Sequence, residues 1–152
     1  SLGDIGCEWA EKWGVERSNS RRVERLIVMV MEKAKTFEDL WIWQQARILV
    51  KEIYQDFSEG IGSRDFGFRD QIQRAGVSIM NNIAEGFERI SDVEFARFLD
   101  IAKGSCGETR SLYYTAEDLG HLTPDIAQTR RERAMKISGG ISSLSKHLRN
   151  KV

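Results

Sequence analysis

The fold is decided by residues 91–124, which read SDVEFARFLDIAKGSCGETRSLYYTAEDLGHLTP. Mostly apolar residues recur here at intervals of three and four, the period of one face of an α-helix. They are Phe95, Leu99, Ala102, Cys106, Thr109, Tyr113 and Ala116. Ser91 and Glu94 form a capping box at the start, and Gly120 is the residue expected just after the end. Thr123-Pro124 is a typical beginning of another helix.

The same period continues on both sides of this stretch. A first stripe follows a capping box of Thr36 and Asp39 and ends at the glycine-rich residues 58–62. Its members are Leu40, Trp43, Arg47, Val50, Tyr54 and Phe57. A second stripe, with Gly86 as its expected end, holds Phe68, Ile72, Ala75, Ile79 and Ile83. The stripe after Pro124 holds Ile126, Ala134, Ile137, Ile141, Leu144 and Leu148. The sequence therefore predicts an all-α fold, an up-down-up-down antiparallel four-helix bundle.

Length and composition fit one such domain. The chain has 152 residues, 41% of them hydrophobic and 30% charged, which suits a single packed core. Residues 36–152 are predicted to form the bundle, and residues 1–35 an N-terminal extension in which Ser20 caps a short helix. The longest apolar run, residues 26–31, is too short to cross a membrane. Without a secretory signal or a C-x-x-C motif, we expect a cytoplasmic location.

Apolar residues also lie outside the predicted core stripes. Trp41 and Ile48 fall nearly opposite the first stripe, and Val77, Met80 and Ala84 form a second apolar arc beside the next one. A helix that is apolar on two sides is usually buried on two sides. These five residues predict a homo-oligomer interface. The other interpretation is that they are scattered surface residues, or that residues 1–35 cover them.

A line of polar residues borders the core stripes of the second and third helices. It consists of Gln71, Arg74, Ser78, Asn82, Glu85, Ser105 and Glu108. We interpret it as a buried hydrogen-bond network that fixes helix register or subunit pairing, with a solvated face as the alternative. Arg130 falls on the apolar stripe of the fourth helix, so it is expected near a bundle end or beside a carboxylate. Gly139-Gly140 predicts a close helix approach or a kink, and Gly104 and Gly107 predict close packing.

The net charge is zero, with 23 basic and 23 acidic residues, but the charges are segregated. Residues 130–152 hold seven basic residues and one acidic residue, whereas residues 36–125 hold nine basic and sixteen acidic residues. Either the two regions neutralise each other, or the basic end contacts nucleic acid. The candidate contacts are Arg131, Arg133, Lys136, Lys146, Arg149 and Lys151. No aromatic residues interleave with them, which favours phosphate contact over base stacking.

Several chemistries find no support in the sequence. His121 and His147 are the two histidines, too few for a di-iron bundle and wrongly spaced for zinc. No phosphate-binding glycine loop is present. Ser105 and Cys106 have no neighbouring base that could activate them as nucleophiles. Glu85 and Glu108 could act as an acid and a base, but a hydrogen-bonded structural role is favoured for them. We expect no catalytic residue, no metal and no cofactor.

Three blocks of sequence resemble a known family. They are QIQRAGVSI at 71–79, NIAEGF at 82–87, and RFLDIAKGS at 97–105 with Glu108, supported upstream by FEDL at 37–40 and Trp43-Gln44. Over about residues 36–148 the chain resembles bacterial four-helix-bundle proteins named after reading frames in intervening sequences of 23S ribosomal RNA. That name records gene location and not activity.

The resemblance implies four antiparallel helices and a ring-shaped homo-oligomer, most commonly a pentamer. Similar bundles are accessory proteins of diversity-generating retroelements, where a basic pentameric barrel binds nucleic acid and a reverse transcriptase. Our leading hypothesis is a non-enzymatic homo-oligomeric scaffold or accessory protein, whose partners are its own copies and the backbone of RNA or DNA. The alternatives are an adaptor that binds another protein on its acidic surface without nucleic-acid activity, and a small-molecule binder. No membrane partner is expected.

Overall fold

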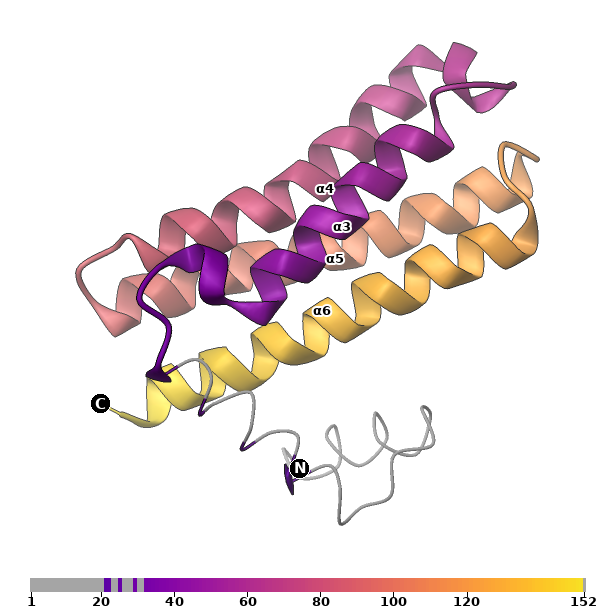
Figure 1. Ribbon diagram of the computed structural model, residues 1–152. Helices are drawn as coiled ribbons and strands as arrows, with labels where there is room; N and C mark the ends of the chain where they lie inside the picture. The colour runs from indigo at the N-terminus through magenta and orange to yellow at the C-terminus, as the bar shows by residue number, and fades with distance from the viewer. Residues whose placement is uncertain (1–20, 23–24, 26–28, 30–31, 152) are drawn as a thin grey trace.

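The computed structural model describes residues 21–22, 25, 29 and 32–151 of the chain. Its long helices are α3 (Trp41–Asp56), α4 (Phe66–Phe87), α5 (Asp92–Asp118) and α6 (Pro124–Asn150) (Figure 1). Two short 3-10 turns, η1 (Phe37–Asp39) and η2 (Gly62–Arg64), precede α3 and α4. No strand occurs in the described residues. The all-α prediction is confirmed.

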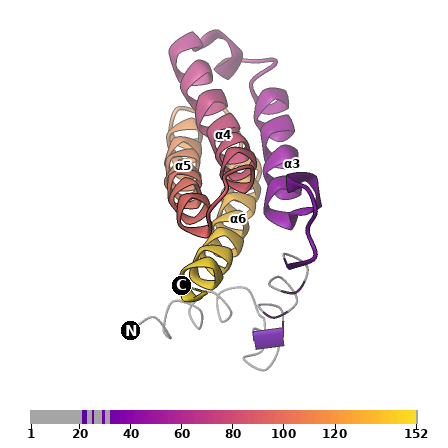
Figure 2. The same cartoon turned by 90° about the vertical axis from the view of Figure 1, so that its left-hand side faces the viewer.

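The helices alternate in direction and close into a bundle. Each helix packs on its predecessor, and α6 also packs on α3 (Figures 1 and 2). The α3–α4 and α5–α6 connections lie at one end, which we call the loop end. The start of α3, the α4–α5 connection and the end of α6 lie at the other, which we call the terminal end. The predicted four-helix arrangement is therefore the observed one.

The predicted helix ends are largely confirmed. Ser91 accepts a hydrogen bond from the Glu94 amide at the start of α5, and Thr123 caps α6 ahead of Pro124. Gly120 follows α5 with a φ of 70°, a left-handed conformation that costs glycine little. The Thr36 capping box is also present, but it caps η1, and α3 begins only at Trp41.

The predicted core stripe of α3 is wrong by one position. The buried row is Ile42, Ala46, Leu49 and Ile53, whereas Arg47 and Tyr54 of the predicted row are exposed. One position turns a helix by about 100°. Because α3 packs on both α4 and α6, it carries apolar residues over a wide arc of its surface. The predicted stripe followed one edge of this arc and not its centre. Trp41 consequently lies beside α6 and not opposite the core.

Two glycines allow helices to approach closely. A Cβ atom at Gly140 of α6 would lie 2.6 Å from Cγ2 of Ile42, which confirms the predicted close approach. Gly86 was expected to end its helix, but it lies inside α4, where a Cβ atom would lie 2.7 Å from Cβ of Phe98. Gly104 and Gly107 have nothing within 4 Å of such an atom. The predicted close packing at those two glycines is therefore wrong within this chain.

Candidate functional site

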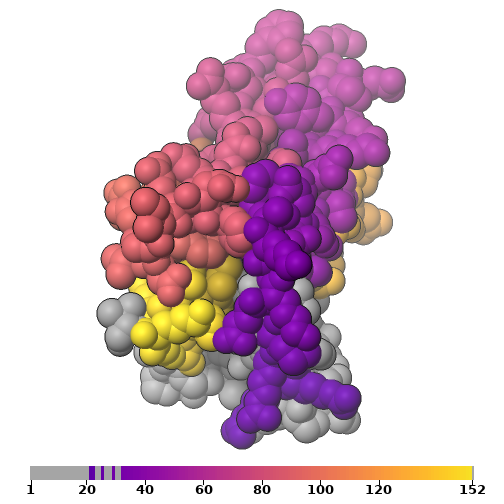
Figure 3. All heavy atoms as spheres, turned by 60° about the vertical axis from the view of Figure 1, so that its left-hand side comes forward, coloured from indigo at the N-terminus to yellow at the C-terminus, as the bar shows by residue number. Residues whose placement is uncertain are grey.

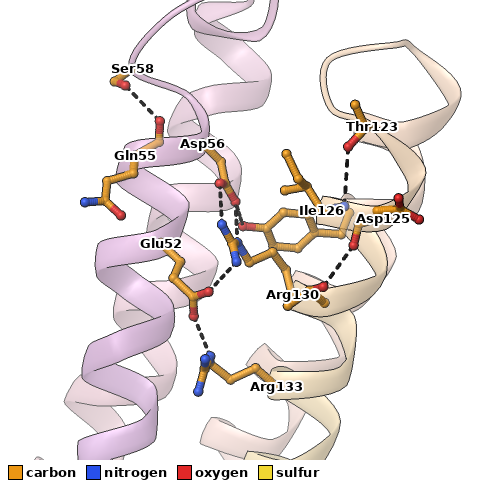
Figure 4. Close-up of polar contacts among 11 residues, drawn as sticks. Glu52, Gln55, Asp56, Ser58, Thr123, Asp125, Ile126, Arg130 and Arg133 are labelled. Atoms are coloured by element: carbon orange, nitrogen blue, oxygen red, sulfur yellow. Dashed lines mark hydrogen bonds and ion pairs between the residues drawn. The ribbon is translucent and has the colours of Figure 1, made fainter.

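The most extensive polar cluster lies on the seam between α3 and α6, in contact with α5. Two acids one helical turn apart on α3, Glu52 and Asp56, face Arg130 and Arg133 of α6 (Figure 4). Tyr113 of α5 bonds to Asp56 at the same place. We call these five residues the seam cluster. Their positions follow from the rotation of α3 about its own axis. The rotation that buries Ile42 and Ile53 also directs Glu52 and Asp56 toward α6.

Arg130 is the centre of the seam cluster. Its Nε and Nη2 atoms donate to Oδ2 and Oδ1 of Asp56, each at 2.8 Å, and Nη1 donates to Glu52. The arginine is 18% exposed and the aspartate 7%, so the bidentate pair is largely shielded from water. Such pairs are among the strongest hydrogen bonds in proteins. The expectation that Arg130 meets a carboxylate is confirmed.

The remaining members of the seam cluster contact the same two carboxylates. Arg133 pairs with Glu52 and donates from Nη1 to the Gln45 side chain at 2.8 Å. The buried Tyr113 hydroxyl donates to Oδ2 of Asp56 at 2.8 Å. With two arginines and two carboxylates, the seam cluster is electrically neutral.

Two members of the seam cluster, Tyr113 and Arg130, hold their protons more firmly than usual. Burial, and then the negative charge of Asp56, raise the pKa of Tyr113 far above its usual value. The hydrogen bond to Asp56 raises the pKa of Arg130. The tyrosine thus stays a donor and the arginine stays a cation at any physiological pH. Groups held in this way do not exchange protons with a substrate, and the arrangement is suited to locking three helices together.

The arginines of α6 pair with acids of the same chain. Arg131 lies 2.9 Å from Glu117 and stacks 4.0 Å above the centre of the Tyr114 ring. Arg149 donates to both carboxylate oxygens of Asp100. Together with Arg133, these are three of the six predicted nucleic-acid contacts. For these three arginines, the basic end of the chain and its acidic middle neutralise each other between packed helices. This agrees with the first of the two interpretations of the segregated charges.

The other three predicted contacts, Lys136, Lys146 and Lys151, are exposed on α6 and just after it. Nucleic-acid contact through α6 stays a prediction. A phosphate at Arg131, Arg133 or Arg149 would have to compete with a carboxylate already in place.

The predicted polar line divides into two groups. Ser105 of α5 donates to the Ser78 hydroxyl of α4 at 2.9 Å, and the Asn82 amide donates to the same hydroxyl at 3.0 Å. We call these three residues the hydroxyl cluster. The other residues lie on the surface. Arg74 pairs with Asp70 of the same helix, and Glu85 pairs with Arg89, which lies just after α4. Gln71 and Glu108 are exposed.

The predicted interface residues do not share one face. Trp41 packs against α6, since its ring lies 3.1 Å from the place of a Cβ atom at Gly140, and Ile48 follows on the same side of α3. Met80 packs partly against the core. Val77 and Ala84 are half-buried. Gly76 lies against Ile53, so both residues fall on the side of α4 that borders α3. Whether these residues form a subunit interface stays a prediction.

The considered nucleophiles are held in structural roles. Burial raises the pKa of the Cys106 thiol to about 12, so the thiolate is not accessible near neutral pH. Ser105 belongs to the hydroxyl cluster. Among the described residues, no three metal-ligating side chains come together. Within the same part of the chain, no helix combines the length and hydropathy that a membrane span requires.

The sequence did not point to a contact at the loop end. His121 Nε2 lies 3.0 Å from Oδ2 of Asp65, and this pair joins the α3–α4 and α5–α6 connections. Asp65 also caps α4 by accepting from the Phe68 amide. The hydrogen bond from His121, followed by that from Phe68, lowers the pKa of Asp65. The available signals were the Asp at a helix start and a histidine just after another helix.

The sequence matches one family model. The family described as 23S rRNA-intervening sequence protein matches over residues 38–143. That range includes α3, α4, α5 and most of α6, and with them the seam cluster and the hydroxyl cluster. Comparison with curated proteins gives no match.

Proposed function

The chain belongs to the family of 23S rRNA-intervening sequence proteins, and on that basis we propose that it is a homo-oligomeric helical scaffold or accessory protein. The proposed role is structural and not catalytic. Five copies are the expected assembly, as the resemblance implies. The polar clusters support a structural role, because each one is directed at a neighbouring helix of the same chain.

The observation that carries the proposal is an apolar surface along α3 and α4 that the bundle leaves open. Tyr54 is 49% exposed, and Val77, Met80 and Ala84 are only half-buried. Ile53 lies against Gly76, so the neighbouring positions Tyr54 and Val77 fall on the same side of the α3–α4 seam. We call these four residues the open face. Contiguous apolar patches on a protein surface commonly mark protein interfaces.

The open face includes three of the five predicted interface residues, Val77, Met80 and Ala84. Trp41 is no longer the best position to test, because it packs on α6 of its own chain and a charge there would damage the fold. Val77 and Ala84 are better positions, because they border the surface and lie on a well-packed helix.

The test is the mass of the assembly at micromolar concentration, measured by light scattering and native mass spectrometry. We expect about five times the 17.4 kDa mass of the chain. The variant Val77→Glu should reduce the assembly toward the monomer, since a buried charge at an interface is costly. The matched control is Gln71→Glu on the same helix. Gln71 is exposed and points about 120° away from Val77 around the helix axis.

Two results would contradict the proposal. A wild-type protein that remains a monomer would exclude the scaffold and favour an adaptor whose partner docks on the open face or the acidic surface. An oligomer that withstands Val77→Glu would place the interface elsewhere.

A titration with RNA and duplex DNA at two salt concentrations tests the nucleic-acid partner, because phosphate contact weakens steeply with salt.

A further inference from the structure

Two ion pairs join α5 to α6, one toward each end of the bundle. Arg149 pairs with Asp100 toward the terminal end, and Arg131 pairs with Glu117 toward the loop end. Figure 3 shows the terminal end, where the coral start of α5 lies next to the yellow end of α6. Because the two helices are antiparallel, these pairs fix which residues of α5 and α6 lie level with each other between them.

Three basic side chains lie along this α5–α6 seam between the two pairs. On α5, Lys103 and Arg110 precede Glu117 by about four and two helical turns, so both lie on the side that faces α6. Counting inward from the ion pairs, Lys103 is level with Lys146 of α6, and Arg110 is level with Ser138. We call Lys103, Arg110 and Lys146 the α5–α6 cations. The residues level with the two cations of α5 are thus a third cation and a hydroxyl, and not a carboxylate.

The side chains of the α5–α6 cations make no hydrogen bond or ion pair within the part of the chain that the structure describes. The Nε atom of Arg110 is even shielded from solvent. Two acids occur in the same stretch, but Glu108 lies about 160° from Arg110 around α5, and Glu132 accepts from the Gln128 side chain of its own helix. A shielded donor without an acceptor costs free energy, so an anion bound at this seam would stabilise it.

Tyr114 adds an exposed aromatic ring to the same row of α5. It follows Arg110 by about one turn, and the guanidinium of Arg131 stacks 4.0 Å from its ring centre. The side chain is nevertheless 54% exposed. Gly107, about one turn before Arg110, has no atom within 4 Å of the place of a Cβ atom, so the backbone there is open to a ligand. The structure thus places an aromatic ring among the cations, which the sequence of α6 alone did not show.

A second copy of the chain is a poor source of the anion. Among the described residues, most exposed acids without an ion-pair partner lie at or near helix ends, and only Glu108 lies in the middle of a helix. They form no row that matches the α5–α6 cations. An acidic peptide would use the cations but not the ring. A nucleic-acid strand uses both, because its phosphates bind cations and its bases stack on exposed aromatic rings.

We propose that the α5–α6 seam binds single-stranded nucleic acid, with phosphates on the α5–α6 cations and a base stacked on Tyr114. The inference rests on the proposed accessory role, because it names the partner of that role. Of the contacts predicted from sequence, it retains Lys146 and leaves the paired arginines of α6 in their structural roles. A duplex binds less tightly, since its bases are already stacked on one another.

Fluorescence anisotropy on the full chain tests the phosphate contact, with labelled oligouridine RNA, oligothymidine DNA and a duplex of the same length. Both single strands should bind more tightly than the duplex. Arg110→Gln should weaken their binding and reduce the slope of log affinity against log salt by about 0.7, the contribution of one phosphate of a single strand. Lys103→Gln, at an exposed position, should act in the same way. The matched control is Arg64→Gln, the same substitution at an exposed arginine of η2, which should leave affinity and slope unchanged.

The aromatic contact is tested by two substitutions of Tyr114. Tyr114→Ala should weaken single-strand binding by about tenfold, the usual loss for one stacked base. Tyr114→Phe should retain the affinity, because the ring is kept. Duplex binding should be equal in both variants.

Three results would overturn the proposal: no strand bound at low salt, equal effects of Arg110→Gln and Arg64→Gln, or full affinity in Tyr114→Ala. Displacement of the strands by polyglutamate at the same charge concentration would also overturn it, in favour of an acidic protein partner. Light scattering on the same samples separates this inference from the assembly. A wild type that assembles and binds no strand contradicts the inference alone, whereas a monomer that binds strands contradicts only the assembly.

Discussion

Two seams of the bundle are held together by different means. The α3–α6 seam contains the seam cluster, in which four charged groups and a tyrosine share hydrogen bonds away from water. The α4–α5 seam has the neutral hydroxyl cluster and the close approach at Gly86. The first seam depends on the pairing of its charged groups. The second depends on the close fit of the α4 and α5 surfaces. They should therefore respond differently to substitution and to acid.

The charged seam specifies one arrangement of α3. If α3 slid by one turn along α6, Glu52 would remain near an arginine but Asp56 would lose its bidentate partner. A buried carboxylate without a partner is costly, whereas an apolar row tolerates such a shift more easily. We infer that the seam cluster selects the register of α3.

The largest expected effect is that of Arg130→Met. Removing the guanidinium leaves Asp56 and Glu52 shielded from water and without their main partner, since the arginine contributes three hydrogen bonds. We expect the free energy of unfolding to fall by about 3–5 kcal/mol, measured by urea denaturation.

The control for this prediction is Arg74→Met, which removes an exposed ion pair with Asp70 on the surface of α4. Exposed pairs contribute about 0–1 kcal/mol. A similar small loss in both variants would mean that water reaches the seam cluster freely. The two seams would then differ in the residues they contain but not in how those residues stabilise the fold.

A smaller effect is expected at Gly86, which tests the seam that depends on shape. The Cβ atom of Gly86→Ala would lie 2.7 Å from Cβ of Phe98 and 3.3 Å from the Phe95 carbonyl oxygen. These atoms are close to the backbone and cannot simply rotate away. We expect a loss of about 1–3 kcal/mol in the free energy of unfolding, despite the better helix propensity of alanine.

Gly104→Ala is the matched substitution, because no atom lies within 4 Å of its Cβ position. Alanine should stabilise α5 there by about 0.5–1 kcal/mol. If Gly104→Ala instead weakens the assembly, the outer face of α5 is covered by another subunit. If Gly86→Ala is neutral, the α4–α5 seam is less tightly packed than the structure shows.

The fold could be predicted from sequence because its signals are local. Ser91, Thr123-Pro124 and Gly120 mark helix ends by their own backbone chemistry, and four apolar periods leave few ways to arrange the helices. The phase of α3 could not be predicted in the same way. Its apolar arc is wide enough for two rows, and only contact with both α4 and α6 selects the row of Ile42.

The candidate site was predictable in part. Arg130 was conspicuous because a charge on an apolar stripe requires a partner. Its partners Glu52 and Asp56 were missed because the misplaced stripe of α3 directed them away from α6. Gly86 is a similar case, since a glycine near a helix end indicates either a cap or a close approach, and only the position of Phe98 distinguishes them.

The smallest expected effect concerns acid and the Asp65–His121 pair, which joins the α3–α4 half of the bundle to the α5–α6 half. The pKa of Asp65 is lowered in the folded chain. A carboxyl with a lowered pKa stabilises the fold above its unfolded pKa, and this contribution is lost as the pH falls through the folded value. The advantage of the wild type over Asp65→Asn should thus shrink as the pH falls from about 5 toward about 2. Ser105→Ala should have a pH-independent effect over the same range, because the hydroxyl cluster contains no titrating group. Parallel urea denaturation series check both variants, and an equal pH dependence would show that the acid response does not come from this pair.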